Sequence, residues 1–359
     1  MIRLSICLVL TMASALAAQS PPGNYRVGVV SESSDTITWL RPDGDGLALD
    51  HKVPVGLMPT DNDGPHNITV ARDGKSYYVT VAHGTPYGSL WKFATSSDSV
   101  EGRAPVELFP TTIGLTPDGQ YAFVANSDFH GDHPRINVVS VIHTPTMTSI
   151  TDVPACDMPH GVKVNHAGTR VYVSCMHSDE ILEIDVGTLK LLRRAPTGMG
   201  HSMSSTSSAS CAPTFVSVSP DDKRLYVACN TGNTLQAWDA ASLSKVRELE
   251  VGHGAYNVEP SVDGKLVIVT NKKDQSVSLV DAGTLKELAR IPTSKKVVHG
   301  VAYSPDGRLA YISCESVGAD PGAVDVIDLA ARKRLSSIPV AGQPTGITVR
   351  MLPPNPPTH

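Results

Sequence analysis

The chain has 359 residues, of which 41% are hydrophobic and 18% are charged, so it can bury a large core. Its formal net charge is -5, which argues against nucleic acid or an anionic membrane as a partner, because phosphate binding needs a basic surface. The sequence has no Gly-x-Ser-x-Gly elbow, no Gly-x-x-x-x-Gly-Lys loop and no Cys-x-x-Cys-His site. We therefore expect no nucleotide and no covalent haem.

The first residues have the features of a secretory signal peptide. Arg3 supplies the positive start, residues 4–13 form a short apolar run, and Ala15-Leu16-Ala17 fits a cleavage site. We predict a signal peptide over residues 1–18 and a periplasmic or secreted protein; a buried N-terminal helix is the alternative. The apolar run is too short for a permanent anchor and no second run of that length follows, so no membrane insertion is expected.

From residue 26 onward, short β-rich runs bounded by turns follow one another in a repeating order. The order begins in mid-repeat, with runs at residues 26–31, 36–39 and 51–55. Full copies follow, each reaching a turn position eight residues after its first residue, and they begin at His66, Thr111, His160, Thr214, Tyr256 and His299. A last run, at residues 344–349, supplies the strand that the first copy lacks.

Four strands in roughly 45 residues are typical of a propeller blade. We predict an all-β, seven-bladed β-propeller over residues 19–350, in which the C-terminal strand closes the first blade. A Pro-rich tail follows at residues 351–359. Another all-β arrangement, such as a pair of sandwiches, is the alternative.

Strings such as Leu225-Tyr-Val-Ala-Cys-Asn230 and Val267-Ile-Val-Thr-Asn271 resemble the repeat of the YVTN family of β-propeller proteins. The resemblance covers almost all of the chain after the signal peptide, although Cys often replaces the Thr of the family string. It implies the propeller fold. It leaves the function open, because the wider group includes lactonase-like enzymes, surface-layer proteins and nucleic-acid-binding members.

The first residues of the copies should meet at one mouth of the central channel, since each blade runs outward from its inner strand. We call them the ring residues: Thr345, His66, Thr111, His160, Thr214, Tyr256 and His299. His66, His160 and His299 are predicted metal ligands, because converging neutral imidazoles suit zinc, copper, iron and nickel. The alternative is that these histidines cap strand ends through backbone carbonyls. Thr111, Thr214, Tyr256 and Thr345 are predicted to bind a small ligand.

The ends of the second strands are expected to form another ring at this mouth: Ser31, Val81, Asn126, Cys175, Cys229, Thr270 and Cys314. Cys175 and His177 would then add ligands for copper or zinc. The alternative for Cys175, Cys229 and Cys314 is that a small buried cysteine fills the core. Cys156 and Cys211 stand in neighbouring loops and are candidates for a disulfide with each other.

Loops on the same face carry further histidines, at His83, His130, His133, His201 and His253. Solvent exposure is the ordinary explanation for such loop residues. Two insertions, at residues 128–134 and 198–213, are either functional loops or solvated ones. Four glutamates are candidate general acids with surface exposure as the alternative: Glu32, Glu180, Glu259 and Glu315.

These observations lead to three functional hypotheses. The first is an exported propeller that binds a small molecule or a transition metal, copper or zinc, at a His-rich channel mouth. The second is a lactonase- or lyase-type enzyme with a mouth histidine as general base. The third is a non-catalytic module that binds a protein or a surface. A monomer is expected in each case.

Overall fold

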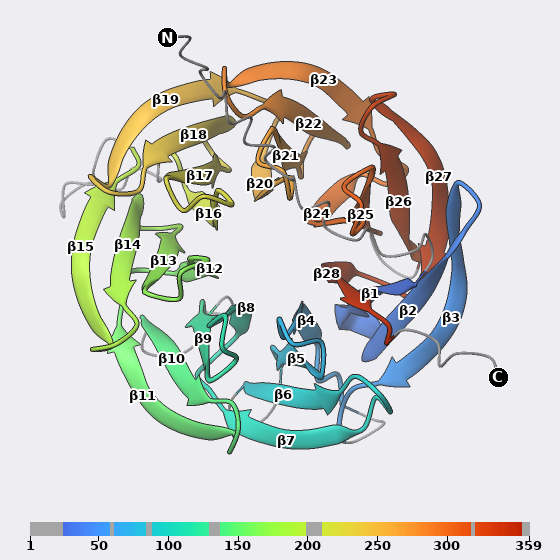
Figure 1. The fold of residues 1–359 in the computed structure, drawn as a ribbon, viewed down its shortest axis with the longest axis horizontal. Helices are drawn as coiled ribbons and strands as arrows, with labels where there is room; N and C mark the ends of the chain where they lie inside the picture. Colours follow the sequence, from blue (N-terminus) through green and yellow to red (C-terminus); the bar gives the residue numbers. More distant parts are fainter. Residues whose placement is uncertain are drawn as a thin grey trace, which may run out of the picture.

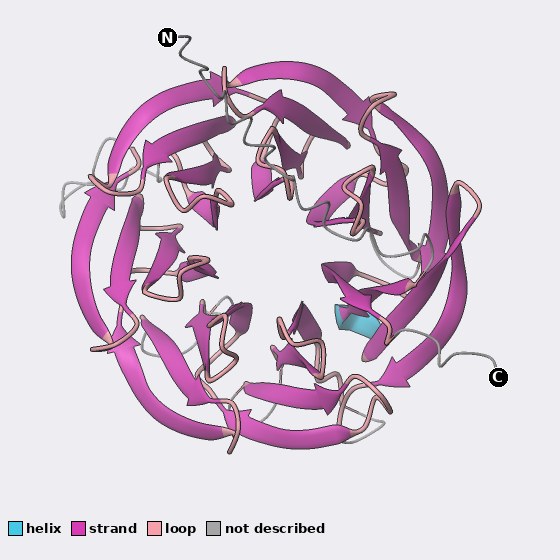
Figure 2. Ribbon diagram, viewed as in Figure 1, coloured by secondary structure: helices cyan, strands magenta, loops and turns pink. Residues whose placement is uncertain are grey.

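The computed structural model describes residues 24–57, 61–83, 88–128, 137–198, 210–316 and 320–353. Seven four-stranded antiparallel sheets surround a central axis, which confirms the predicted all-β, seven-bladed propeller (Figure 1). Figure 2 shows strands throughout the ring; within the described ranges the one helical element is a 3-10 turn at Glu32–Ser34. The predicted signal peptide lies outside the described residues. No helix in the described part is long and apolar enough to span a membrane.

Each blade has four strands that follow one another outward from the axis, and we number the blades from the one that contains β28 and β1. The inner strands are β28 (Pro344–Met351), β4 (Pro65–Val70), β8 (Pro110–Leu115), β12 (Pro159–Val164), β16 (Pro213–Val218), β20 (Ala255–Pro260) and β24 (Val297–Tyr303). The second strands are β1 (Tyr25–Ser31), β5 (Ser76–Val81), β9 (Tyr121–Asn126), β13 (Arg170–Cys175), β17 (Arg224–Cys229), β21 (Leu266–Asn271) and β25 (Leu309–Glu315).

The remaining two strands of each blade lie farther from the axis (Figure 1). The third strands are β2 (Thr36–Asp43), β6 (Ser89–Ala94), β10 (Val138–His143), β14 (Glu180–Asp185), β18 (Thr234–Asp239), β22 (Ser276–Asp281) and β26 (Gly322–Asp328). The outer strands are β3 (Gly46–Pro54), β7 (Val100–Pro105), β11 (Thr148–Pro154), β15 (Lys190–Pro196), β19 (Ser244–Glu250), β23 (Lys286–Pro292) and β27 (Lys333–Val340).

The core lies between neighbouring blades rather than within one sheet. Second strands are buried on both faces, as in β5, whereas outer strands such as β11 are largely exposed. Trp39 and Tyr77, from the first and second blades, meet edge to face with ring centroids 5.3 Å apart. Apolar and aromatic residues on both faces of the middle strands therefore hold the blades together.

The turns that the sequence predicted between inner and second strands are confirmed. In the seventh blade, Ser304 donates to Asp306 at 2.6 Å and accepts from the Leu309 amide at 2.9 Å. Gly307 takes a positive φ of 68°, a conformation that glycine adopts without strain. The recurring turn fixes where each second strand begins.

The two ends of the chain complete one blade, as the sequence predicted. Strand β28 pairs antiparallel with β1, so the first sheet has the order β28-β1-β2-β3. Strand β1 is thereby paired on both sides, and β28 takes the inner position that the first strand takes in every other blade. This closure places Thr345 beside His66 and His299 in the ring of inner strands.

Candidate functional site

Every inner strand contains a β-bulge at its ring residue. In the fourth blade, Pro159 pairs with Cys175 but Val162 pairs with Val173, so the inner strand holds one extra residue. The other blades show the same shift. A bulge redirects side chains away from the regular alternation of a strand, and such bulges are common beside functional sites.

Large and small side chains alternate around most of the ring, and the large ones meet at the axis. The ring centroids lie 5.5 Å apart for His66 and His299, 4.7 Å for His299 and Tyr256, and 5.4 Å for Tyr256 and His160. Threonines stand between His66 and His299 and between Tyr256 and His160. Small residues at alternate positions leave room for four rings at the mouth. The predicted convergence of the three histidines is therefore present as a chain of ring contacts that runs through Tyr256.

Hydroxyl groups tie each inner strand to the next blade. Each of the seven ring carbonyls accepts a hydrogen bond from a Ser or Thr hydroxyl of the preceding blade, at 2.5 to 3.5 Å. In the blades with a ring threonine, that residue is the donor: Thr345, Thr111 and Thr214. Where the ring residue is His or Tyr, the donor comes from the second strand: Thr80, Ser174, Thr270 and Ser313.

This pattern assigns different tasks to the two kinds of ring residue. The hydroxyls of Thr111, Thr214 and Thr345 already donate to neighbouring blades, so their predicted role as ligand donors would require these bonds to open. The four blades with His or Tyr satisfy the same carbonyl from another position. Of their ring side chains, only His160 also joins this tie within the described residues, through its Nδ1 and the Thr214 carbonyl at 2.8 Å.

The His66 imidazole is oriented by a buried carboxylate. Its Nδ1 lies 2.7 Å from Glu32 Oε2, and the other Glu32 oxygen lies 3.1 Å from His83 Nε2. Burial would raise the pKa of Glu32, but the contacts with His66 and His83 outweigh burial and hold that pKa well below its usual range. The His66 Nε2 atom is buried without a hydrogen-bond partner among the described residues.

His160 is the ring histidine that fits the capping alternative. Its Nδ1 lies 2.8 Å from the Thr214 carbonyl, and its Nε2 lies 3.0 Å from the Tyr256 hydroxyl. Since a carbonyl only accepts, Nδ1 carries the proton and Nε2 accepts from Tyr256. Burial, together with the nearby His66, lowers the pKa of His160 to about 3. His160 therefore stays neutral and orients Tyr256.

His299 lies beside a lysine that the sequence analysis missed. Both ring nitrogens of His299 are buried without a hydrogen-bond partner among the described residues. Lys272 Nζ lies 4.1 Å from the centre of the Tyr256 ring and 3.0 Å from Glu315 Oε1. Burial disfavours the charged lysine, but the nearby Tyr256 and Glu315 outweigh it and raise the pKa of Lys272. We call His66, His160, Tyr256, Lys272 and His299, with Glu32 and Glu315, the mouth cluster.

The expected second ring is displaced by one residue. Glu32, Lys272 and Glu315 each follow directly after a residue that pairs with the residue just before a ring residue. The side chains at the positions predicted for the mouth point into the blades instead. Asn126, for example, donates to Ser140 of its own blade at 3.0 Å. Successive strand side chains face opposite sides, so a shift of one residue exchanges mouth and core. In the sixth blade the aligned residue is Asn271, not Thr270.

The predicted Cys156–Cys211 disulfide is wrong. Cys156 is bonded to Cys175, and Cys211 is bonded to Cys229, with Cα atoms 5.9 and 4.5 Å apart. Each loop cysteine stands just before an inner strand, and its partner ends the second strand of the same blade. The partner within the blade lies nearer than the equivalent loop of the next blade. Cys314 is the free cysteine of the described chain, and it is buried, as the core alternative predicted.

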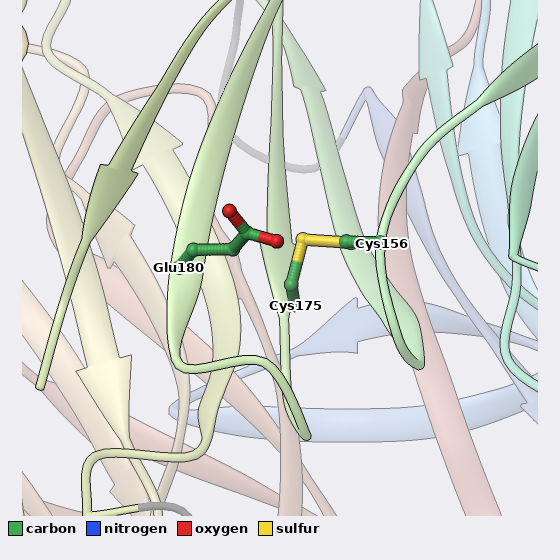
Figure 3. Close-up of side chains that lie close together, drawn as sticks. All are labelled: Cys156, Cys175 and Glu180. Atoms are coloured by element: carbon green, nitrogen blue, oxygen red, sulfur yellow. A yellow bond between two sulfur atoms is a disulfide. The ribbon is translucent and has the colours of Figure 1, made fainter. Parts of the chain in front are cut away.

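The disulfide corrects the prediction that Cys175 is a thiolate ligand. Within the described residues, the one group with three potential ligand atoms mutually within 4.8 Å is Cys156, Cys175 and Glu180 (Figure 3). Its two sulfurs are joined to each other, so neither is a thiolate. His177 is half exposed, with Nδ1 3.9 Å from Asp157. Copper or zinc binding by His66, His160 and His299 stays a prediction.

The loop histidines and the other candidate glutamates lie in several different environments. His253 is exposed, whereas His83 belongs to the Glu32 contact described above. His130, His133 and His201 lie outside the described residues. Glu180 pairs with Arg194 at 2.9 Å, and Glu259 lies deeper in the channel with Lys163. The signal for Lys272, which we missed, is its position directly after β21, equivalent to Glu32 after β1 and close to Glu315 at the end of β25.

Comparison with known proteins supports the fold. Residues 211–300 match the family described as the cytochrome D1 heme domain. The chain is 27% identical over 298 residues to the seven-bladed beta-propeller protein Rv1057 of Mycobacterium tuberculosis, covering 72% of this chain and 70% of that protein.

Two solved structures share the architecture. A chain of Kuenenia stuttgartiensis hydrazine synthase aligns with a TM-score of 0.66 and 20% identity, over 82% of this chain and 93% of that one. The periplasmic gluconolactonase of Pseudomonas aeruginosa aligns with a TM-score of 0.74 and 18% identity, over 92% and 99%. At these identities the two structures show a shared fold.

Proposed function

We propose that this chain, a seven-bladed β-propeller of the YVTN type, is an exported protein that binds a small organic ligand at the mouth cluster. The observation that carries the proposal is that His66 Nε2 and both nitrogens of His299 are buried without a hydrogen bond among the described residues; Glu315 Oε1 lies 3.9 Å from His299 Nε2, beyond hydrogen-bond distance. Buried polar atoms are rarely left unpaired, because each costs about 1–3 kcal/mol. A ligand that pairs with these atoms would recover that free energy.

The cluster favours a ligand that carries both a hydroxyl and a carbonyl or carboxylate group. Glu32 selects the His66 tautomer whose Nδ1 bears hydrogen, so that Nε2 accepts from a ligand hydroxyl. Lys272 supplies a cation that suits a carbonyl or carboxylate oxygen. His299 offers one donor and one acceptor between them. A hydroxy acid or its lactone has this combination of groups.

Two further observations support export of the protein. The disulfides Cys156–Cys175 and Cys211–Cys229 are typical of an oxidising compartment. The fold is also that of a gluconolactonase described as periplasmic. Both agree with the signal peptide predicted at residues 1–18.

Binding is tested by calorimetry with glycolate and D-glucono-1,5-lactone as probes. We expect saturable binding to the wild type and at least a roughly tenfold weaker Kd in His66→Ala, His299→Ala and Lys272→Met, since each removes one polar partner. His253→Ala is the matched control, because His253 is exposed. Equal affinity in the mouth variants and the wild type would contradict the proposal. Plasma mass spectrometry of the same untagged protein would reveal a bound copper or zinc ion.

Hydrolysis of a lactone or ester is the second candidate, favoured by the Glu32–His66 pair. A histidine oriented by a carboxylate, with its other nitrogen free, has the arrangement of a general base. In this reaction His66 Nε2 takes a proton from water, and the resulting hydroxide attacks the carbonyl carbon. The bond to the leaving oxygen then breaks, and that oxygen takes the proton back from His66 as it leaves as a hydroxyl group. Lys272 is the cation of the cluster that would stabilise the oxyanion.

We expect Glu32→Gln and His66→Gln to lower kcat/KM for lactone hydrolysis by about a hundredfold or more, because general-base catalysis contributes on that scale. The rate is followed in a pH-stat with D-glucono-1,5-lactone, and His253→Gln is the control. Turnover that persists unchanged in both variants would exclude His66 as the base. Binding without turnover in the wild type would exclude the hydrolytic function and retain the binding function.

The haem named by the family match is not part of this proposal. The matched residues include Tyr256, Lys272 and His299, but the rings of His299 and Tyr256 contact each other with centroids 4.7 Å apart. His299 also contacts His66 at 5.5 Å. These ring contacts with Tyr256 and His66 leave no open flat face of His299 for a planar macrocycle, whereas a small ligand needs only its nitrogen atoms.

A further inference from the structure

We propose that the channel holds a second ligand site, separate from the mouth cluster, that takes a small uncharged molecule with several hydroxyl groups. The site is a cavity of about 490 Å³ inside the inner strands, and this volume is in the usual range for small-molecule pockets. Its lining starts one residue beyond the ring side chains, at Asn67, Phe215 and Asn257. It extends to the turns that follow the inner strands, at Pro220 and Ser261, so it faces the side opposite the mouth.

A charged pair crosses this cavity from one blade to another. Lys163 Nζ, from the fourth blade, lies 2.8 and 3.1 Å from the two carboxylate oxygens of Glu259 in the sixth. Ser217, from the blade between them, donates to Glu259 at 2.9 Å. The two side chains are 34% and 29% exposed, so both heads are accessible from the cavity. Lys163, Glu259 and Ser217 thus offer strong hydrogen-bond donors and acceptors at fixed positions.

Two asparagines add neutral groups at the inner end of the cavity. Asn67 and Asn257 each follow a ring residue, and the hydroxyls of Thr80 and Thr270 accept from their backbone amides at 2.9 Å. These bonds fix the backbone from which each side-chain amide extends. Each amide offers two donors and one acceptor, a set that matches ligand hydroxyls.

Charge and shape decide the ligand class. Lys163 and Glu259 neutralise each other, so an anion or a cation would have to disrupt a pair that already satisfies both groups. Hydroxyl groups instead donate to Glu259 and accept from Lys163 without breaking it. Phe215 and Tyr303 provide apolar surface in the same lining. A cyclic polyol has the required combination of hydroxyl edge and apolar face.

The test is calorimetry and saturation-transfer NMR on the full mature chain, with myo-inositol as the neutral probe and acetate as the charged one. We expect saturable binding of myo-inositol and not of acetate, with Kd raised at least about tenfold in Asn257→Ala and Glu259→Gln. The pair variant Lys163→Met/Glu259→Met removes both charges together, so it tests the site without leaving one charge unpaired. Lys265→Met, at an exposed turn, is the matched control.

Each outcome separates this site from the mouth cluster. Binding that survives His66→Ala and His299→Ala but fails in the cavity variants supports the second site, whatever the fate of the mouth proposal. Loss of myo-inositol binding in His66→Ala with retention in Asn257→Ala would overturn it, because the probe would then sit at the mouth. Absence of saturable binding to the wild type up to the solubility of the probe would also overturn it.

Discussion

Individual histidines of the ring differ in what their nitrogens contact. His160 uses both nitrogens within the protein, on Thr214 and Tyr256. His66 uses one, on Glu32, and His299 makes no hydrogen bond among the described residues, with Glu315 Oε1 3.9 Å from its Nε2. Histidine at the same repeat position therefore has two roles. His160 positions Tyr256, whereas His66 and His299 each keep at least one nitrogen without a hydrogen bond in the described chain. The sequence alone presented the three histidines as equivalent.

The buried ring histidines should make the protein sensitive to mild acid. A histidine in the unfolded chain has a pKa of about 6.5. Burial, with His66 nearby, lowers the pKa of folded His160 to about 3, and burial with Lys272 nearby holds that of His299 well below its usual value. Between these limits the unfolded chain binds protons that the folded chain does not. The free energy of unfolding should therefore fall as pH falls below about 6.5, by about 1.4 kcal/mol per pH unit for each histidine.

Urea unfolding at about pH 7.5 and about pH 5.5 measures this dependence. We expect His160→Gln to reduce the difference between the two pH values, and the exposed-site variant His253→Gln to leave it unchanged. A wild-type free energy of unfolding that is the same at both pH values would show that the ring histidines are not held neutral.

At the scale of strands, the hydroxyl–carbonyl hydrogen bonds between blades explain which ring positions can hold His or Tyr in place of Thr. A hydroxyl must reach each ring carbonyl, and it comes either from the ring residue or from the second strand. In the third and fifth blades the second strand has Ala125 and Ala228 at that position, and the ring residue is threonine. The blades with His or Tyr in the ring have Ser or Thr there instead. This exchange is what makes room for the mouth cluster.

Moving one hydroxyl donor from the ring residue to the second strand tests this exchange directly. Thr214→Val removes the hydroxyl that donates to the Tyr256 carbonyl at 2.5 Å, which should lower the free energy of unfolding by about 1–3 kcal/mol because the carbonyl is buried. Adding Ala228→Ser to the same chain should restore part of the loss, since it recreates the donor used in the fourth blade. Denaturant unfolding of the single and double variants measures both changes. A double variant no more stable than Thr214→Val would refute the interchange.

At the scale of the whole molecule, one arginine of the C-terminal strand contacts both the first and the second blade. Arg350 of β28 is 4% exposed and lies 3.8 Å above the Trp39 ring of its own blade. Its Nη1 also donates to Asp98 of the second blade at 2.7 Å. Arg350 and Asp98 are 252 residues apart in sequence, so this contact joins the C-terminal strand to the second blade. The ring is thus joined by side chains as well as by backbone pairing.

Arg350→Ala should lower the free energy of unfolding by about 1–3 kcal/mol, because it removes the charged hydrogen bond to Asp98, which keeps its contacts with Tyr77 and His51. Thermal or denaturant unfolding measures the loss. Arg308→Ala is the matched control, since the Arg308 side chain is 75% exposed. A loss no larger than that of the control would show that backbone pairing alone closes the ring.

The sequence by itself determined the number of blades, the turns and the closure, because these depend on local alternation and on a period that recurs along the chain. It also brought His66, His160 and His299 to one mouth through their shared repeat position. The disulfide partners, the displacement of the second ring and the tie from neighbouring blades were decided only by the tertiary structure. A bulge shifts register by one residue, and in a strand one residue separates a side chain at the channel mouth from one in the core. Lys272 became visible at the site for the same reason, whereas Glu32 was already a candidate from the sequence.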